Sequence, residues 1–309
     1  MESNFADRLE DAVDRVGNPC LVGLDPHPDL LPPEYSAARP GSSRAERARA
    51  AGDFLCEVIE VVAGRIPAVK PQSALFEALG VEGARAWERV VRTARASGLL
   101  VIGDVKRGDI DSTARAYARA FLEEDPPLGD DRGTPGSRCD AITVNPYLGA
   151  DSVRPFVETC SRTGAGIYVL VRTSNPGAST FQDHGAPRLY ERVADAVVEW
   201  GRELIGARGL SSVGAVVGAT HPAELAALRA RMPTVPFLIP GYGSQGAGVA
   251  DVLGGFLPGG RGALVNSSRA ILFAWKEARF AGRHWKDATR AALEEMIAAL
   301  SASRARARA

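Results

Sequence analysis

The stretch Leu99-Leu100-Val101-Ile102-Gly103-Asp104-Val105-Lys106-Arg107-Gly108-Asp109-Ile110 decides the fold and points to the chemistry. Its first half is an apolar run that is typical of a buried strand. Side chains alternate along a strand, so Asp104 and Lys106 project from one face, and Asp109 follows the strand end. Two acids and a base therefore meet where a strand enters its loop, the edge at which parallel α/β proteins place their active sites. A lysine held between carboxylates stays protonated, which suits it to donate a proton or to stabilise a carbanion.

Short apolar runs of the same kind recur along the chain and alternate with amphipathic stretches. Including the first, they are Cys20–Leu24, Ala68–Val69, Leu99–Val105, Ala141–Val144, Ile167–Val171, Val213–Val217, Val235–Ile239 and Ala263–Val265. Near-continuous apolar strands between helices predict a parallel sheet that is covered on both faces. Eight such units in 309 residues predict one closed (β/α)8 TIM barrel domain over residues 1–309.

The two ends of the chain and three connections add to this framework. Apolar residues at helical spacing predict an N-terminal amphipathic helix, a final helical region covers roughly 269–301, and we expect a flexible basic tail at 302–309. Three long connections are rich in Gly, Pro and polar residues: 26–42, 124–139 and 174–187. The first and third follow strand ends and should lie on the active face, whereas the second precedes a strand and should lie on the opposite face.

Composition narrows the class of protein. Lys plus Arg equals Asp plus Glu at 37 each, which argues against non-specific binding to nucleic acid. No uncharged apolar run approaches the ~20 residues of a membrane span, and the N-terminal segment lacks the apolar centre of a signal peptide. The cysteines form no CxxC motif and have no histidine at metal-ligand spacing, so we expect inert buried thiols in a reducing, cytoplasmic compartment and no metal site. These are Cys20, Cys56, Cys139 and Cys160.

Polar residues follow nearly every predicted strand. They include Asp25, Lys70, Gln72, Asn145, the segment Arg172–Pro176, the segment Pro240–Gly248, Ser268 and Arg269. A single Asp–Lys pair at a barrel mouth could serve structure alone. Two lysines and three aspartates on the first three strands exceed what a structural network needs, so we interpret the cluster as a functional site.

The seventh and eighth strand ends favour an anion site. Glycines at 241, 243, 246 and 248 allow backbone N–H groups to approach a ligand, and Arg269 can hold a phosphate with its planar fork. Barrels often bind phosphate at these two loops. The same glycines match the dinucleotide pattern GxGxxG, but they follow the seventh strand and no strand-end acid comes about 20 residues later, so we do not expect NAD binding.

Taken together, these residues resemble the orotidine 5′-phosphate decarboxylase family, in its longer bacterial subgroup. The family's Asp-x-Lys-x-x-Asp signature appears as Asp104, Lys106 and Asp109, followed by Ile110. The resemblance runs from Asp25 to Arg269. One position departs from it, because many members have glycine where this chain has Ser268.

The resemblance implies a cofactor-independent decarboxylation of orotidine 5′-phosphate to UMP and CO₂ by a homodimer. Lys106 would protonate the ring carbon, with Asp104, Asp109 and Lys70 as the other catalytic residues. Asp109 would reach the partner's site, together with Thr113. The implied substrate-binding residues are Asp25, Thr113, Ser174, Pro240, Gln245, Ser268 and Arg269.

Two other functions remain open from the residues. A related sugar-phosphate decarboxylase that needs Mg²⁺ should carry an extra acid near the second or third strand, where this chain has Lys70. A barrel that only binds a nucleotide phosphate would not need the set of Asp104, Lys106 and Asp109.

Overall fold

The computed structural model describes residues 4–124, 138–243 and 248–306. Within these ranges eight parallel strands pair in chain order, and β8 pairs with β1 to close a barrel. The strands are β1 Cys20–Leu24, β2 Ala68–Pro71, β3 Leu100–Arg107, β4 Ala141–Val144, β5 Gly166–Arg172, β6 Val213–Val217, β7 Phe237–Ile239 and β8 Ala263–Ser267. The predicted barrel is confirmed, and each predicted run forms a strand whose ends differ by at most two residues.

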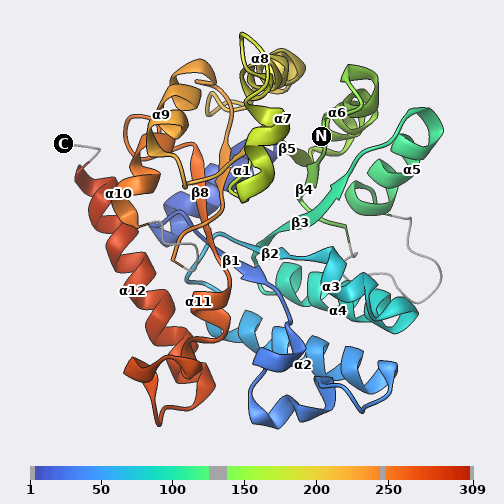
Figure 1. Ribbon diagram of the computed structural model, residues 1–309, viewed down its shortest axis with the longest axis vertical. Coiled ribbons are helices and arrows are strands. Elements are labelled where there is room, and N and C mark those ends of the chain that lie inside the picture. The colour runs from blue at the N-terminus through green and yellow to red at the C-terminus, as the bar shows by residue number, and fades with distance from the viewer. Residues whose placement is uncertain (1–3, 125–137, 244–247, 307–309) are drawn as a thin grey trace.

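Most of the helices ring the strands, as Figure 1 shows. The helices of the described residues are α1 Phe5–Val16, α2 Arg44–Val62, α3 Ser73–Glu77, α4 Gly80–Ala96, α5 Asp111–Leu122, α6 Ala150–Thr163, α7 Ser179–Gln182, α8 Leu189–Gly201, α9 Pro222–Arg231, α10 Val249–Val252, α11 Arg269–Leu272 and α12 Trp285–Arg306. Side-chain caps begin two of these helices, and Asn4 accepts a hydrogen bond from the N–H of Ala6 at the start of α1. Ser43 and Glu46 form a reciprocal capping box at the start of α2.

The predicted N-terminal helix is confirmed as α1, and it packs against the interior of the barrel. Phe5, Leu9 and Val13 share one buried apolar cluster with inward residues of the strands. The ring of Phe5 meets Tyr168 of β5 edge-on, with the centroids 6.0 Å apart. The interior is therefore apolar on the side of α1, which leaves the polar residues at the opposite, carboxyl ends of the strands.

The prediction of a final helical region over roughly 269–301 is wrong in part. The chain forms only the short α11 and two single 3₁₀ turns before α12 begins at Trp285. Aromatic packing explains the break, because Phe273 stacks on Phe54 of α2 and Trp285 also contacts Phe54. Gly282 takes the left-handed conformation just before α12.

The predictions for the C-terminal tail and for the three long connections can be compared with the structure in part. α12 continues to Arg306, so the tail is helical up to that residue, and 307–309 lie outside the described residues. The connections 26–42 and 174–187 follow β1 and β5 and contain short helical turns. Of the connection 124–139, residues 125–137 lie outside the described residues.

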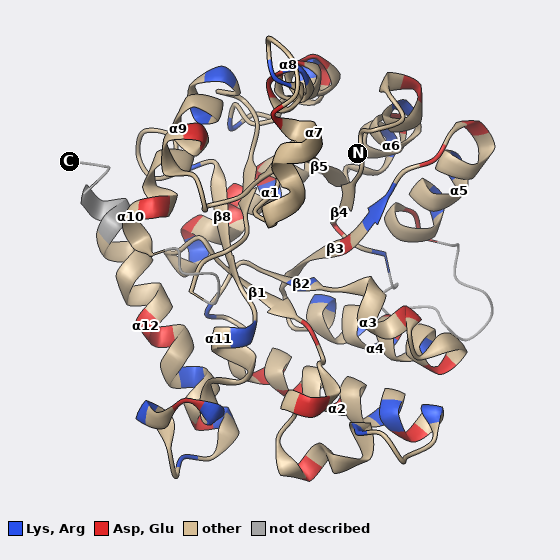
Figure 2. Ribbon diagram, viewed as in Figure 1, with Lys and Arg blue, Asp and Glu red and all other residues tan. Residues whose placement is uncertain are grey.

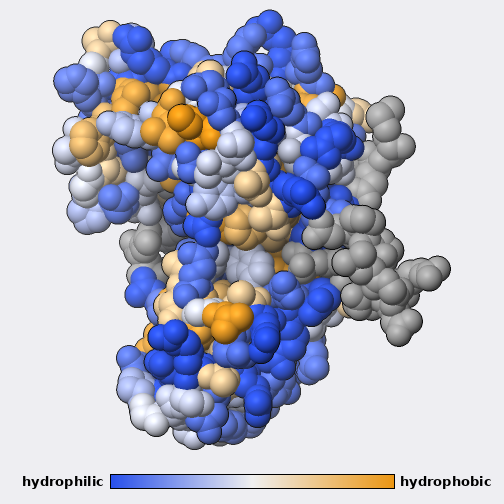
Figure 3. Space-filling view, turned by 90° about the vertical axis from the view of Figure 1, so that its right-hand side faces the viewer, coloured by the Kyte–Doolittle hydropathy of each residue, from blue (hydrophilic) through white to orange (hydrophobic). Residues whose placement is uncertain are grey.

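Charge is concentrated on the outer helices, and β3 carries both signs of charge within the ring (Figure 2). The face on the right of Figure 1 is mainly hydrophilic with separate apolar patches (Figure 3). None of the described helices is both long and apolar enough to cross a membrane.

Candidate active site

The ends of β1, β2 and β3 open into a hollow of about 480 Å³. Asp25, Gln72 and Lys106 are among the residues that line it. The parallel strands bring together side chains that lie up to 82 positions apart in sequence, 25 and 107 being the extremes. The hollow is therefore built from the strand ends at which the sequence predicted a functional site.

Asp104 is the centre of the charge cluster. Its Oδ2 accepts hydrogen bonds from Lys70 Nζ at 2.8 Å and from Gln72 Nε2 at 3.0 Å. Its Oδ1 accepts hydrogen bonds from Lys106 Nζ at 2.5 Å and from Thr143 Oγ1 at 3.0 Å. Two cations and two neutral donors thus fix the plane of one carboxylate.

The two lysines of this cluster differ in how far their side chains are exposed. The side chain of Lys70 is 6% exposed, whereas that of Lys106 is 48% exposed and lines the hollow. Asp104 is buried with Lys70. A ligand in the hollow would therefore meet the ammonium group of Lys106, with Lys70 and Asp104 beneath it.

The cluster keeps its charges although it is buried. Burial alone would raise the pKa of Asp104, but Lys70 and Lys106 outweigh that effect and hold the pKa well below its usual range. Burial would likewise lower the pKa of Lys70, but attraction to Asp104 and Asp25 outweighs it, so the pKa lies above its ordinary value. Asp104 and Lys70 therefore form an ion pair at neutral pH.

Asp25 offers an open acceptor beside this pair. Its Oδ1 is buried and has no hydrogen-bond partner among the described residues. Buried polar atoms are normally paired, so an unpaired carboxylate oxygen at the wall of a hollow is suited to a hydroxyl group of a ligand.

Asp109 and Thr113 lie away from the other predicted catalytic residues. Asp109 is half-buried and accepts a hydrogen bond from the N–H of Ile110 at 2.8 Å, and Thr113 is exposed on the first turn of α5. No ion pair joins Asp109 to Lys106 of the same chain. The structure thus brings Asp25, Lys70, Asp104 and Lys106 together, but leaves Asp109 and Thr113 outside that cluster.

The predicted anion site lies at the ends of β7 and β8. Pro240 follows β7, and Gly241 and Gly243 take positive φ angles of 101° and 78°. A Cβ on Gly243 would lie 3.5 Å from the Cβ of Ala270, so this loop packs directly against the start of α11, where Arg269 is exposed. Gln245 lies outside the described residues.

At the eighth strand end the side chain of Ser268 turns toward β1. A Cβ on Gly23 would lie 2.9 Å from the Cβ of Ser268. The serine that departs from the family pattern therefore occupies space that the missing side chain of Gly23 leaves open.

The fifth strand end is held by a buried arginine. Arg172 Nε lies 2.7 Å from Glu224 Oε2, and Arg172 Nη1 lies 3.1 Å from Asp183 Oδ1. These ion pairs tie β5 to the connection 174–187 and to α9. Ser174 is the second residue after Arg172, so its backbone is anchored from one side.

Sequence reasoning missed the hydrogen-bonding roles of Gln72 and Thr143. Gln72 stands at a strand end, so its position gave a signal. Thr143 lies inside the apolar run Ala141–Val144, where a threonine is an ordinary strand residue. The alternation of side chains along β4 is the only signal, because it places Thr143 on the same face as Ala141, which faces the barrel interior.

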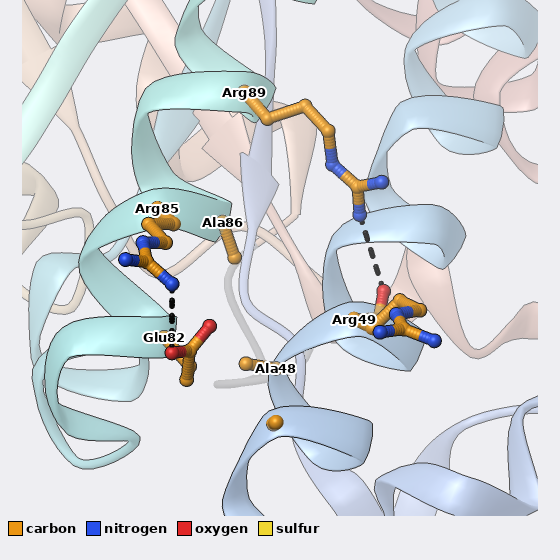
Figure 4. A pocket seen from close by; sticks show the side chains of 7 residues that line it. Ala48, Arg49, Glu82, Arg85, Ala86 and Arg89 are labelled. Carbon is orange, nitrogen blue, oxygen red and sulfur yellow. Dashed lines mark hydrogen bonds and ion pairs between the residues drawn. The ribbon is translucent and has the colours of Figure 1, made fainter.

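A second hollow, between α2 and α4, does not belong to the strand ends (Figure 4). Three of the charged side chains that line it, those of Glu82, Arg85 and Arg89, are already engaged with groups of the protein. Arg85 pairs with Glu82 at 2.9 Å, and Arg89 donates to the carbonyl oxygen of Arg49 at 3.2 Å and pairs with Asp53 at 2.7 Å. Across the described part of the chain, no group of three or more His, Cys, Asp and Glu side chains is placed to hold a metal ion.

Comparisons with known proteins point to one family. Residues 20–281 match the family described as orotidine 5′-phosphate decarboxylase / HUMPS. An orotidine 5′-phosphate decarboxylase of Rhodopirellula baltica is 45% identical over 298 residues, which cover 94% of this chain and 97% of that protein. One from Clostridium perfringens is 38% identical over 276 residues, 88% of this chain and 90% of that protein. The structure of Leishmania donovani OMP decarboxylase superimposes with a TM-score of 0.73 at 34% identity, covering 97% of this chain and 99% of that chain.

Proposed function

The chain belongs to the orotidine 5′-phosphate decarboxylase / HUMPS family, and on that premise we propose that it converts orotidine 5′-phosphate to UMP and CO₂ without a cofactor. The observation that carries the proposal is the position of Asp104 between two ammonium groups. Lys70 is buried beneath it, and Lys106 lines the hollow. A fixed, half-exposed ammonium beside a buried carboxylate fits a reaction that creates and then protonates a carbanion.

The reaction needs such an ammonium because the electron pair that CO₂ leaves on the ring carbon has no other stabilisation. Loss of CO₂ leaves the pair in the plane of the pyrimidine ring, where the π system cannot delocalise it. Lys106 would stabilise this carbanion electrostatically in a site that needs no reorganisation. It would then give its proton to the same carbon and end the reaction as a neutral amine.

The residues around Lys106 would contact different parts of the substrate. Asp104 would lie beside the substrate carboxylate and hold Lys106 in place. Lys70 and Asp25 would contact the ribose, and Ser174 the pyrimidine. Gln245 would bridge the phosphate and the base, Arg269 would hold the phosphate, and Pro240 and Ser268 would also contact the substrate. The phosphate contacts would supply binding energy that is spent on positioning the reacting carbon.

We further propose that two copies of the chain share each site. Asp109 and Thr113 lie outside the cluster of their own chain and would complete the cluster of a partner. Apolar side chains near them favour a contact, since Ile110, Tyr147 and Leu148 are 49%, 75% and 50% exposed at the ends of β3 and β4.

The Mg²⁺-dependent sugar-phosphate decarboxylase is the main alternative, because the description of the family names HUMPS beside orotidine 5′-phosphate decarboxylase. Lys70 argues against it. The ammonium group of Lys70 lies 2.8 Å from Asp104, so it neutralises the carboxylate that a divalent cation would otherwise bind.

Decarboxylation is tested by adding orotidine 5′-phosphate and following its ultraviolet absorbance, with UMP identified by mass spectrometry. We expect turnover that survives exhaustive dialysis against EDTA. Loss of turnover in EDTA that Mg²⁺ restores would favour the sugar-phosphate alternative, and binding without turnover would favour the barrel that only binds.

The role of Lys106 is tested in the same assay. Lys106→Ala should reduce kcat by at least about 1000-fold, because it removes both the electrostatic partner and the proton donor. UMP should still bind, since the phosphate contacts remain. The matched control is Lys286→Ala on α12, where the lysine pairs with Glu57 and not with the cluster. Near-normal turnover of Lys106→Ala would rule out the mechanism.

A further inference from the structure

One buried hydroxyl joins the backbone of β3 to the carboxylate at its centre. Thr143 lies on β4 and is 1% exposed. Its Oγ1 lies 3.0 Å from the backbone nitrogen of Val105, 2.9 Å from that of Lys106 and 3.0 Å from Asp104 Oδ1. A single side-chain atom thus contacts three consecutive residues of the proposed catalytic strand.

Counting donors and acceptors fixes the direction of each bond. A hydroxyl has one proton to donate and two lone pairs to accept with. Two backbone N–H groups donate to Thr143 Oγ1, so both lone pairs are used. The hydroxyl proton is left for Asp104 Oδ1, which as a carboxylate can only accept.

The backbone of β3 needs this hydroxyl because the strand bulges there. Gly103 pairs with Ile142 and Arg107 pairs with Val144, so four steps along β3 match two steps along β4. Within the bulge, Lys106 takes a φ of +46°, which is strained for a residue other than glycine. The N–H groups of Val105 and Lys106 then both turn toward β4, where Thr143 is their acceptor.

We infer that Thr143 is a positioning residue of the reaction, acting through Asp104 and Lys106 without touching the substrate. This inference rests on the proposed decarboxylation. The hydroxyl holds the left-handed backbone of Lys106 and the plane of the Asp104 carboxylate in one network. The bulge in turn aims the Lys106 side chain so that its Nζ lies 2.5 Å from Asp104 Oδ1.

Two variants separate the hydroxyl from the methyl group of Thr143. Thr143→Val keeps the shape but leaves two buried N–H groups and one carboxylate oxygen without their partner. Its kcat should fall about 100-fold, because a displacement of the reacting group by about 1 Å can cost that much. Thr143→Ser keeps the hydroxyl and should retain a kcat close to that of the wild type. Neither should change the dissociation constant of UMP more than a few-fold.

Thr289→Val on α12 is the matched control. Thr289 is also fully buried, and its hydroxyl has no hydrogen-bond partner among the described residues. Removing that hydroxyl should leave kcat unchanged. A loss of kcat in Thr289→Val equal to that in Thr143→Val would show that any buried hydroxyl matters, and would overturn the inference.

Amide hydrogen exchange tests the same network without any reaction. The amides of Val105 and Lys106 should exchange much faster in Thr143→Val than in the wild type or in Thr143→Ser. If the wild type fails to decarboxylate, the proposed function fails but the exchange pattern still tests the network. Unchanged exchange and kcat in Thr143→Val, or equal losses in the valine and serine variants, would overturn the role of the hydroxyl.

Discussion

The side chain of Ser268 fills the space beside Gly23 that a β-carbon would need. A Cβ on Gly23 would lie 2.9 Å from Ser268 Cβ and closer still to its hydroxyl oxygen. The next neighbour, Asn266 Oδ1, would lie at 3.4 Å, an ordinary contact distance. The two residues therefore depend on each other where β1 and β8 close the barrel.

This dependence predicts a strong coupling in a double-mutant cycle. Gly23→Ala should destabilise the fold, because the added Cβ would lie 2.9 Å from the Cβ of Ser268, which a change of side-chain rotamer does not move. Ser268→Gly should cost little and should restore most of the stability of Gly23→Ala. We expect a coupling of about 1–3 kcal/mol from urea unfolding of the four proteins. Additive effects would mean that the neighbours of Gly23 relax independently of Ser268.

The barrel could be predicted from the sequence because each strand is buried on both faces and reads as an apolar run. The run Cys20–Leu24 coincides with β1 in full. The region after β8 could not be predicted in the same way. Its helical periodicity is real, but Phe273 and Trp285 gain more from packing on Phe54 than from continuing one helix, and such a preference depends on tertiary structure.

The buried ion pair of Asp104 predicts a specific pH dependence of stability. The pKa of Asp104 is lower in the folded protein than in the unfolded chain, so its contribution is present above about pH 4 and is lost as the pH falls further. Asp104→Asn lacks this contribution at every pH. At neutral pH the variant should be less stable by about 3–5 kcal/mol, because Lys70 loses its buried partner.

Urea unfolding at a series of pH values checks this prediction. The difference in unfolding free energy between wild type and Asp104→Asn should shrink below about pH 4, by up to 1.4 kcal/mol per pH unit. The exposed Asp29 supplies a control, since Asp29→Asn should show no such trend. A difference that stays constant down to pH 3 would mean that Asp104 has an ordinary pKa.

The charged part of the site could also be predicted, because Asp25, Lys70, Asp104 and Lys106 follow directly from strand periodicity. The network around them could not. Thr143 reaches β3 only because of the bulge and the left-handed backbone of Lys106. Neither feature leaves a mark in the sequence, since lysine is not a residue that usually adopts positive φ.

Arg269 should act only on substrates that carry a phosphate. Arg269→Ala should lower kcat/KM for orotidine 5′-phosphate roughly 10- to 150-fold. This corresponds to a loss of about 1.5–3 kcal/mol of transition-state binding, because the substitution removes charged hydrogen bonds. With orotidine, which lacks the phosphate, the same substitution should have little effect. A large effect on orotidine would assign Arg269 a role other than phosphate binding.

The shared site makes the sharpest prediction, because two impaired chains should repair each other. Lys106→Ala and Asp109→Ala should each be strongly impaired alone. After subunit exchange, one site of each mixed dimer carries both defects, and the other combines an intact Lys106 with an intact Asp109 from the partner. Random pairing makes half of the dimers mixed, so activity should recover to roughly a quarter of the wild-type value.

A matched pair of variants shows whether such recovery reflects a shared site. Asp104 and Lys106 pair within one chain at 2.5 Å, so each site takes both residues from the same copy. Mixing Lys106→Ala with Asp104→Asn therefore leaves every site of a mixed dimer defective, and activity should not recover. Recovery in that control would point to an artefact of mixing. No recovery with Asp109→Ala, despite subunit exchange confirmed by native mass spectrometry, would place Asp109 in the site of its own chain.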